Sequence, residues 1–176
     1  MENRVDEVIK LRKSVRSFQE KSISDEIVTA LLNAAIEAPS ASNNQLWKFG
    51  VVRDSQRIKK IKMFSPGMGG NPPCLIVLCT DKKLAIEKSG KSGTEEALMD
   101  ISMAGENIML KACDLGLGTC AIRSYQPQAV HKLLKLPENL SVDLIISVGY
   151  ADKENKKPAR KPLDEVVFYE KWAEEQ

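Results

Sequence analysis

The chain has 176 residues, of which 43% are hydrophobic and 28% charged, and its formal net charge is +2 at pH 7. This length suits a single domain, residues 1–176, that buries about 70% of the surface exposed by its unfolded chain. The near-neutral charge gives no reason to expect nucleic acid or an acidic membrane as a partner, and without an apolar signal core or a run near the roughly 20 residues of a membrane span we expect a cytoplasmic protein.

Helices and strands alternate along the chain. In chain order we predict helices over 2–13 and 25–38, a strand over 49–53, a short helix over 56–63, a strand over 74–80, a long helix over 94–115, a strand over 119–123, a short helix over 127–134 and a strand over 142–148. Ser24 is a suitable N-cap for the second helix, and Pro39 ends it. Between these elements, residues 65–73 read as a loop rich in Gly and Pro, and residues 81–93 as an exposed charged segment.

The helix over 94–115 has the strongest pattern in the chain. Its apolar residues recur at steps of three and four over a broad face, so it is expected to be central and mostly buried. Gly105 within it is typical of a close helix crossing, and Gly116 is placed as a C-cap. Together with about four strands, this helix predicts an α+β fold, a mixed sheet flanked by helices.

The last 26 residues are polar and basic at first and apolar at the end. The apolar end contains Val166, Val167, Phe168, Tyr169 and Trp172. The run of β-branched and aromatic residues favours an extended segment over a helix. A small sheet and an apolar tail both leave surface to cover, and we predict a homodimer in which each tail adds an edge strand to the partner.

The cysteines and the histidine exclude several kinds of site. Four cysteines without a CxxC motif indicate buried structural thiols in a reducing compartment. The single histidine, His131, is expected on the surface of a short helix. No metal site and no His-dependent triad are therefore expected.

Three polar segments are candidates for ligand binding, and each has a simpler interpretation. Residues 12–16, with three cations and a hydroxyl, suit a phosphate, or are a basic helix C-terminus. Residues 39–47 offer amides and hydroxyls to a heterocycle, or are a polar loop anchored by Trp47. Residues 156–162 are a further anion site or a solvated basic linker. Residues 116–121 spell GxGxxA, but they follow a helix and open a strand, which is the reverse of a dinucleotide fingerprint.

Taken together, these segments resemble the nitroreductase family of flavoproteins. The chain carries RxSxRxF at 12–18, APSxxNxQxW at 38–47, GLG at 116–118, and GY at 149–150 followed by KPLxEVV at 161–167. Each motif alone is weak, but four in this order and spacing are specific, and they cover nearly the whole chain.

The resemblance implies FMN bound at the interface of a homodimer. Arg12, Lys13 and Ser14 would contact its phosphate and ribityl chain, and Arg16 the pyrimidine end of its ring. The phosphate site would be completed by Arg160, with Lys161 nearby.

The remaining contacts implied by the resemblance come from two further segments. One segment belongs to the partner subunit and comprises Pro39, Ser40, Ala41 and Asn43. The other passes beside the flavin ring, with a backbone N–H near flavin N5, and comprises Ile122, Arg123 and Ser124. Many members have Glu-Gly or Gly-Gly at the last two positions, so no role is predicted for the Arg123 side chain. The loop 65–73 has no clear family pattern and receives no contact.

The resemblance also implies a ping-pong reaction, in which NAD(P)H reduces FMN and a flat, electron-poor acceptor such as a nitroaromatic or a quinone then takes the same face. Because the flavin carries the hydride chemistry, no catalytic side chain is expected. Three alternatives stay open. The same fold could perform dehalogenation, flavin destruction or dehydrogenation of a bound substrate; the protein could bind or sense flavin without turnover; or its basic patch could bind a partner without flavin.

Overall fold

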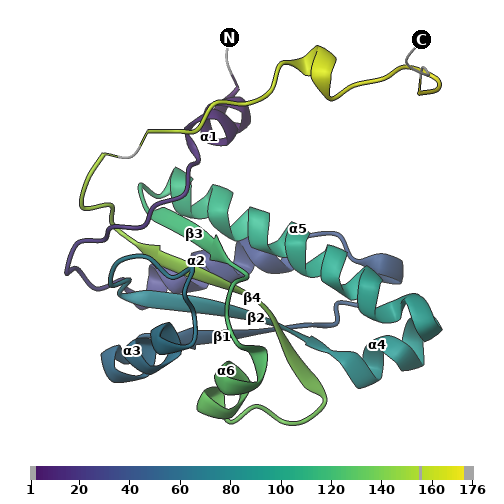
Figure 1. The fold of residues 1–176 in the computed structure, drawn as a ribbon, viewed down its shortest axis with the longest axis horizontal. Helices are drawn as coiled ribbons and strands as arrows, with labels where there is room; N and C mark the ends of the chain where they lie inside the picture. The colour runs from purple at the N-terminus through teal and green to yellow at the C-terminus, as the bar shows by residue number, and fades with distance from the viewer. Residues whose placement is uncertain (1–2, 155, 173–176) are drawn as a thin grey trace.

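The computed structural model describes residues 3–154 and 156–172, which form an α+β domain around one sheet (Figure 1). The helices are α1 Arg4–Leu11, α2 Asp25–Ile36, α3 Ser55–Met63, α4 Lys82–Ser89, α5 Gly93–Asp114 and α6 Pro127–Leu134. The strands are β1 Trp47–Val52, β2 Cys74–Asp81, β3 Gly118–Ile122 and β4 Leu140–Gly149. Short 3-10 turns occur at η1 Ala41–Asn43, η2 Gly90–Ser92 and η3 Leu163–Glu165.

The sheet has the strand order β1-β2-β4-β3, and each neighbouring pair is antiparallel. The expectation of a mixed sheet is therefore wrong for these four strands. Within the described chain, parallel pairing outside the named strands is limited to one bridge, between Ser14 and Thr119. That bridge places the segment after α1 along β3, which is an edge strand of the sheet.

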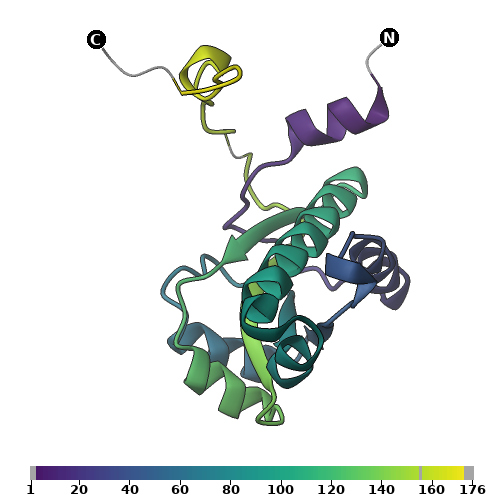
Figure 2. The ribbon, with the colours of Figure 1, turned by 90° about the vertical axis from the view of Figure 1, so that its right-hand side faces the viewer.

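Alternate residues of β2 face two separate cores. Cys74, Ile76 and Leu78 pack with α2 and α5, while the residues between them pack with α3 and α6. Because side chains alternate across a strand, a fully buried apolar run of this kind needs cover on both faces. Figures 1 and 2 show the two helix layers, with α2 and α5 on one side of the sheet and α3 and α6 on the other.

Capping residues determine several helix ends, as predicted from the sequence. Ser24 caps α2 by accepting a hydrogen bond from the Ile27 N–H at 3.4 Å. Gly116 follows α5 with φ of +75°, a conformation that glycine adopts without strain. The helix α6 has the bounds expected for it, and His131 lies on it partly exposed.

The long helix α5 is buried along one side only, which differs from the mostly buried helix expected. Gly105 faces the sheet, and a Cβ atom at this position would lie 2.9 Å from Leu144 Cδ2. This glycine therefore permits α5 to pack closely on the strand β4. It does not mark the helix crossing that was expected. On the opposite side, Leu98, Met99 and Met103 are 44 to 61% exposed. These three residues leave an apolar stripe on α5 without cover in a single chain.

One segment differs from its sequence-based expectation. Residues 82–89, expected as an exposed charged segment, form α4, which Asp81 caps by accepting from the Leu84 N–H at 3.0 Å. Only Ala85 of this helix is fully buried, so no apolar periodicity marked it.

The tail of the single chain contains the turn η3, and its apolar side chains within residues 156–172 are exposed. Pairing of this segment with the sheet of a partner stays a prediction.

Candidate functional site

The basic segment 12–16 leaves α1 and is held against the first residues of β3. The Val15 N–H donates to the Thr119 carbonyl at 2.8 Å, and Ser14 forms an isolated parallel β-bridge with Thr119. A Cβ atom on Gly118 would lie 2.5 Å from the Val15 side chain, so the close approach requires glycine at this position. The GLG motif therefore contributes to the site by admitting the basic segment to the edge of the sheet.

The cations of this segment have few partners in the chain. The Arg12 Nε atom is buried without a hydrogen bond, although it forms an ion pair with Glu106 (Nε to Oε1, 3.1 Å). Within residues 3–154 and 156–172, the side chains of Lys13 and Arg16 form neither a hydrogen bond nor an ion pair. A guanidinium has five N–H donors, so the pair with Glu106 leaves most of the donors of Arg12 available. Cations with so few partners fit an anionic ligand such as FMN.

The loop 65–73 contacts both Arg16 and the residues after β3. Gly69 and Gly70 pack against Arg16 so closely that a Cβ on either would overlap it, and Gly67 packs in the same way on the Ser124 hydroxyl. The basic segment, this loop and the exit of β3 therefore form one surface. Sequence reasoning assigned no contact to the loop; three glycines in four residues were the signal for a close approach.

The side chains of residues 122 and 123 point to other environments. Ile122 is 2% exposed and packs in the core beneath α3 and α6, so only its backbone is available to a ligand. The Arg123 guanidinium lies 5.5 Å from the centre of the Tyr125 ring and lines an open pocket of about 410 Å³ with Lys82 and Asp143. Arg123 thus lines a pocket of mixed charge beside the end of β3.

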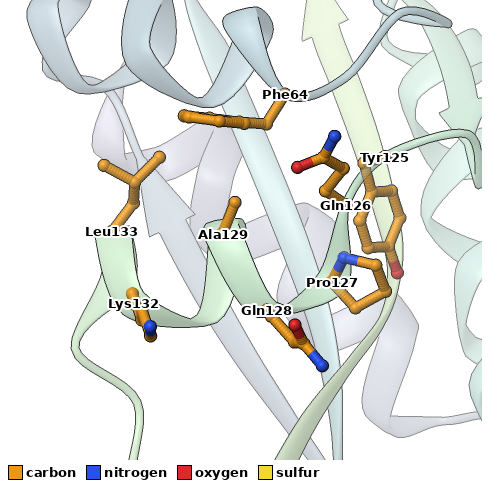
Figure 3. Close-up of a pocket in the computed structure, with 8 residues that line it drawn as sticks. All are labelled: Phe64, Tyr125, Gln126, Pro127, Gln128, Ala129, Lys132 and Leu133. Carbon is orange, nitrogen blue, oxygen red and sulfur yellow. The ribbon is translucent and has the colours of Figure 1, made fainter.

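A larger open pocket of about 790 Å³ lies between the end of α3 and α6 (Figure 3). Figure 3 shows the Phe64 ring above Ala129 and Leu133, with the Gln126 amide pointing toward Phe64. Tyr125 forms one wall; its hydroxyl donates to the Val142 carbonyl at 2.9 Å, and burial raises its pKa to about 12. This phenol therefore stays protonated near neutral pH, and its hydrogen bond ties the segment after β3 to β4.

The loop Pro39–Asn43 lies further along α5. The Ala41 N–H donates to both carboxylate oxygens of Asp100, at 3.1 and 3.3 Å, while Arg12 pairs with Glu106. Six helical residues separate these two acids, about 9 Å along the axis. Within the described chain this loop makes no hydrogen bond or ion pair with Arg12, and residues 42 and 43 give it a tight shape with φ of +50° and +55°.

Burial in this loop contact raises the pKa of Asp100, although the hydrogen bond from Ala41 opposes the rise. The folded protein then holds this proton more tightly than the unfolded chain. Stability from this group is present below the usual Asp pKa of about 3.9 and is lost as the pH rises through the raised value.

We therefore expect Asp100→Asn to gain stability relative to the wild type as the pH rises through this window, because Asn keeps an acceptor for the Ala41 N–H without the buried charge. Urea unfolding at several pH values measures this difference, and the same substitution at the exposed Asp6 is the control. Parallel pH curves for Asp100→Asn and wild type would contradict the assignment.

Arg160 and Lys161 do not reach the basic segment within the single chain. Arg160 Nη1 donates to the Pro158 carbonyl at 3.2 Å, and Lys161 lies 3.9 Å from Glu165. The tail is instead anchored by Lys157, whose Nζ donates to the carbonyls of Ile9 and Lys10 at 3.0 and 2.6 Å. A cation is favoured at the C-terminal end of a helix such as α1. Sequence reasoning missed this anchor inside the basic run.

Two kinds of feature are absent from the described part of the chain. In residues 3–154 and 156–172 no group of three or more His, Cys, Asp and Glu side chains is placed to hold a metal ion. The helices in these ranges also lack a continuous apolar stretch of the length that a membrane span requires. The described chain is therefore an α+β protein whose basic segment 12–16 lies at the β3 edge of the sheet and forms part of a binding site.

Comparisons with known proteins agree with this description. A model of the nitroreductase family matches residues 9–65 and 57–150. A relative from Archaeoglobus fulgidus, named for NADH dehydrogenase and NAD(P)H nitroreductase activities, is 38% identical over 169 positions that cover 93% of this chain and 88% of the relative. An FMN reductase of Bacillus subtilis that uses NAD(P)H is 29% identical, covering 96% of this chain and 75% of that protein. The solved FMN-dependent nitroreductase of Clostridium difficile R20291 has a TM-score of 0.80 at 29% identity, covering 94% and 98% of the two chains.

The chain belongs to the nitroreductase family. The family match confirms the resemblance drawn from the four motifs, and the names of the relatives agree with the predicted class, an NAD(P)H-dependent flavin oxidoreductase.

Proposed function

We propose that this chain is an FMN-dependent oxidoreductase that transfers hydride from NAD(P)H to a flat, electron-poor acceptor such as a nitroaromatic or a quinone. The observation that carries the proposal is the basic segment: Arg12, Lys13 and Arg16 stand at the edge of the sheet, and within the described residues Glu106 is the one side chain that pairs with any of them. The names of the relatives support FMN and NAD(P)H as the two cofactors. Four free cysteines among the described residues suit the cytoplasm, where we place the protein.

The residues of this chain bind and orient the flavin, which when bound supplies the hydride chemistry itself. Arg12 and Lys13 neutralise the phosphate, with Ser14 beside them. Arg16 would lie at the pyrimidine end of the ring, where a fixed cation would stabilise the negative charge that reduction adds. The Ser124 backbone would pass the ring, and the neighbouring Tyr125 is tied to β4 by its hydroxyl.

We also propose that the site is completed by a second copy of the chain. Met99 and Met103 of the exposed stripe on α5 line a hollow together with Pro39 and Ala41, and Glu106, which pairs with Arg12, lies about one turn further along the helix. In a two-fold dimer the same patch meets itself, so residue i contacts j and j contacts i. Packing α5 antiparallel on its copy brings the partner's Pro39–Asn43 loop toward Arg12.

The first test is the colour of the purified protein. We expect it to be yellow and to release FMN, not FAD, on denaturation. The cations Arg12 and Lys13 fit a single phosphate. The GxGxxA motif leads into the strand β3 and not into a helix, so it is not the dinucleotide fingerprint that would favour FAD. Chromatography of the released flavin identifies it. A colourless protein that takes up no added FMN would overturn the proposed function.

The second test separates an enzyme from a flavin-binding protein without turnover. We measure NADPH and NADH oxidation by the FMN-loaded protein, with and without a nitroaromatic or a quinone. Oxidation that requires the acceptor supports the proposed reaction, whereas a stably bound flavin that neither donor reduces would favour a sensing role.

A further inference from the structure

The loop 65–73 presses on the backbone of Arg16 through two glycines. A Cβ atom on Gly69 would lie 2.7 Å from Arg16 Cβ, and one on Gly70 would lie 2.5 Å from the Arg16 carbonyl oxygen. Gly70 also has φ of +60°, which side chains other than glycine adopt with strain. Gly69 therefore needs glycine because of its contact with Arg16, and Gly70 needs it because of that contact and because of its own φ.

The other side of Gly70 is tied to α3. Lys62 Nζ donates to the Gly70 carbonyl at 2.5 Å and to Asn71 Oδ1 at 3.2 Å. Lys62 is partly buried, so the contact with Gly70 is shielded more than a surface hydrogen bond. Lys62, Gly70 and Arg16 thus form a continuous chain of contacts from α3 to the basic segment.

We infer that Lys62 and Gly70 are positioning residues that set where the Arg16 guanidinium stands. The Arg16 side chain is exposed and has no hydrogen bond or ion pair within the described residues, so its place depends on its backbone. Electrostatic stabilisation falls with distance and requires a charge that is already in place. The inference rests on the proposed function, because it assigns the loop a role in tuning a bound flavin.

The sharpest test compares two glycines. Gly70 and Gly90 have nearly the same φ, +60° and +63°, but no atom lies within 4 Å of a Cβ at Gly90. Replacement by Ala strains both, and only Gly70→Ala collides with Arg16. We expect Gly70→Ala to make two-electron reduction of FMN about tenfold less favourable, a shift of about 30 mV. Gly90→Ala is expected to keep the wild-type potential.

A second pair of variants tests the anchor without changing the loop backbone. Lys62→Met removes the donor to Gly70, and Lys60→Met removes an exposed lysine of the same helix. We expect only Lys62→Met to lower the potential and to weaken FMN binding by apoprotein, measured by flavin fluorescence. Far-UV circular dichroism checks that each variant is folded, and Lys62→Arg, which keeps a donor, should restore the potential.

The decisive measurement is a double-mutant cycle with Arg16→Ala. If Lys62 acts through Arg16, Lys62→Met should lower the potential in the wild-type background and change nothing further in Arg16→Ala. An equal shift in both backgrounds, or no shift in either, would overturn the inference while the proposed function stands. Wild-type protein that binds no FMN would overturn both.

Discussion

Replacing Arg12 by Ala is expected to weaken FMN binding by about 1.5–3 kcal/mol, which is one to two orders of magnitude in the dissociation constant. Arg12 is the member of the basic segment that is already desolvated: its Nε is buried without a hydrogen bond and its one ion pair is with Glu106. The substitution removes the donors offered to the phosphate and leaves the Glu106 carboxylate uncompensated near the anion. Both effects weaken the binding of FMN.

Fluorescence titration of apoprotein with FMN measures this loss, and Arg4→Ala is its control. Arg4 also comes from the N-terminal region and also pairs with an acid of α5, Asp114, at 2.8 Å, but it is more exposed and lies within α1. Unchanged FMN affinity in Arg12→Ala, or an equal loss in Arg4→Ala, would remove Arg12 from the phosphate site.

Elements with local signals were predictable from the sequence. Ser24 at the start of α2, Pro127 at the start of α6 and Gly116 after α5 each determine a helix end through their own backbone or side chain. The strand β2 was predictable because both of its faces are buried, which leaves a continuous apolar run. Such signals depend on residues close in sequence.

Features that depend on distant contacts were not predictable. The antiparallel order β1-β2-β4-β3 follows from pairing between segments far apart in the chain. The contact of Gly70 with Arg16 joins residues on either side of two helices and a strand, and the Lys157 anchor joins the tail to α1. The four motifs identified the family, but the single chain does not bring Arg160 or the loop Pro39–Asn43 to Arg12. Those assignments stay predictions about the dimer.

Cutting the chain after Pro162 is expected to cost the dimer and the flavin together. This cut keeps Lys157 on the carbonyls at the end of α1, and it keeps Arg160 and Lys161. It removes six apolar side chains that are 38 to 82% exposed in the single chain, namely Leu163, Val166, Val167, Phe168, Tyr169 and Trp172. Figure 1 shows the tail passing α1 and continuing away from the sheet, so a partner is needed to cover these residues.

The expected size of this effect follows from the area that the partner would cover. Full burial of a large apolar side chain contributes roughly 1.5–3 kcal/mol. Phe168 and Trp172, whose rings already meet edge to face at 5.4 Å, are present twice in a dimer. At the lower value these four side chains contribute together about 6 kcal/mol, so their loss weakens dimerisation by about four orders of magnitude.

Light scattering and flavin absorbance measured on the same samples test the coupling. Because we place Arg12 and the partner's Ser40 on one FMN, flavin content should fall in step with dimer content across a dilution series. A cut after Trp172, which keeps every apolar residue of the tail named above, is the control and should stay dimeric and yellow. If the chain cut after Pro162 also stays dimeric and fully yellow, the tail does not hold the dimer, and the exposed stripe on α5 is left as the surface that carries the interface.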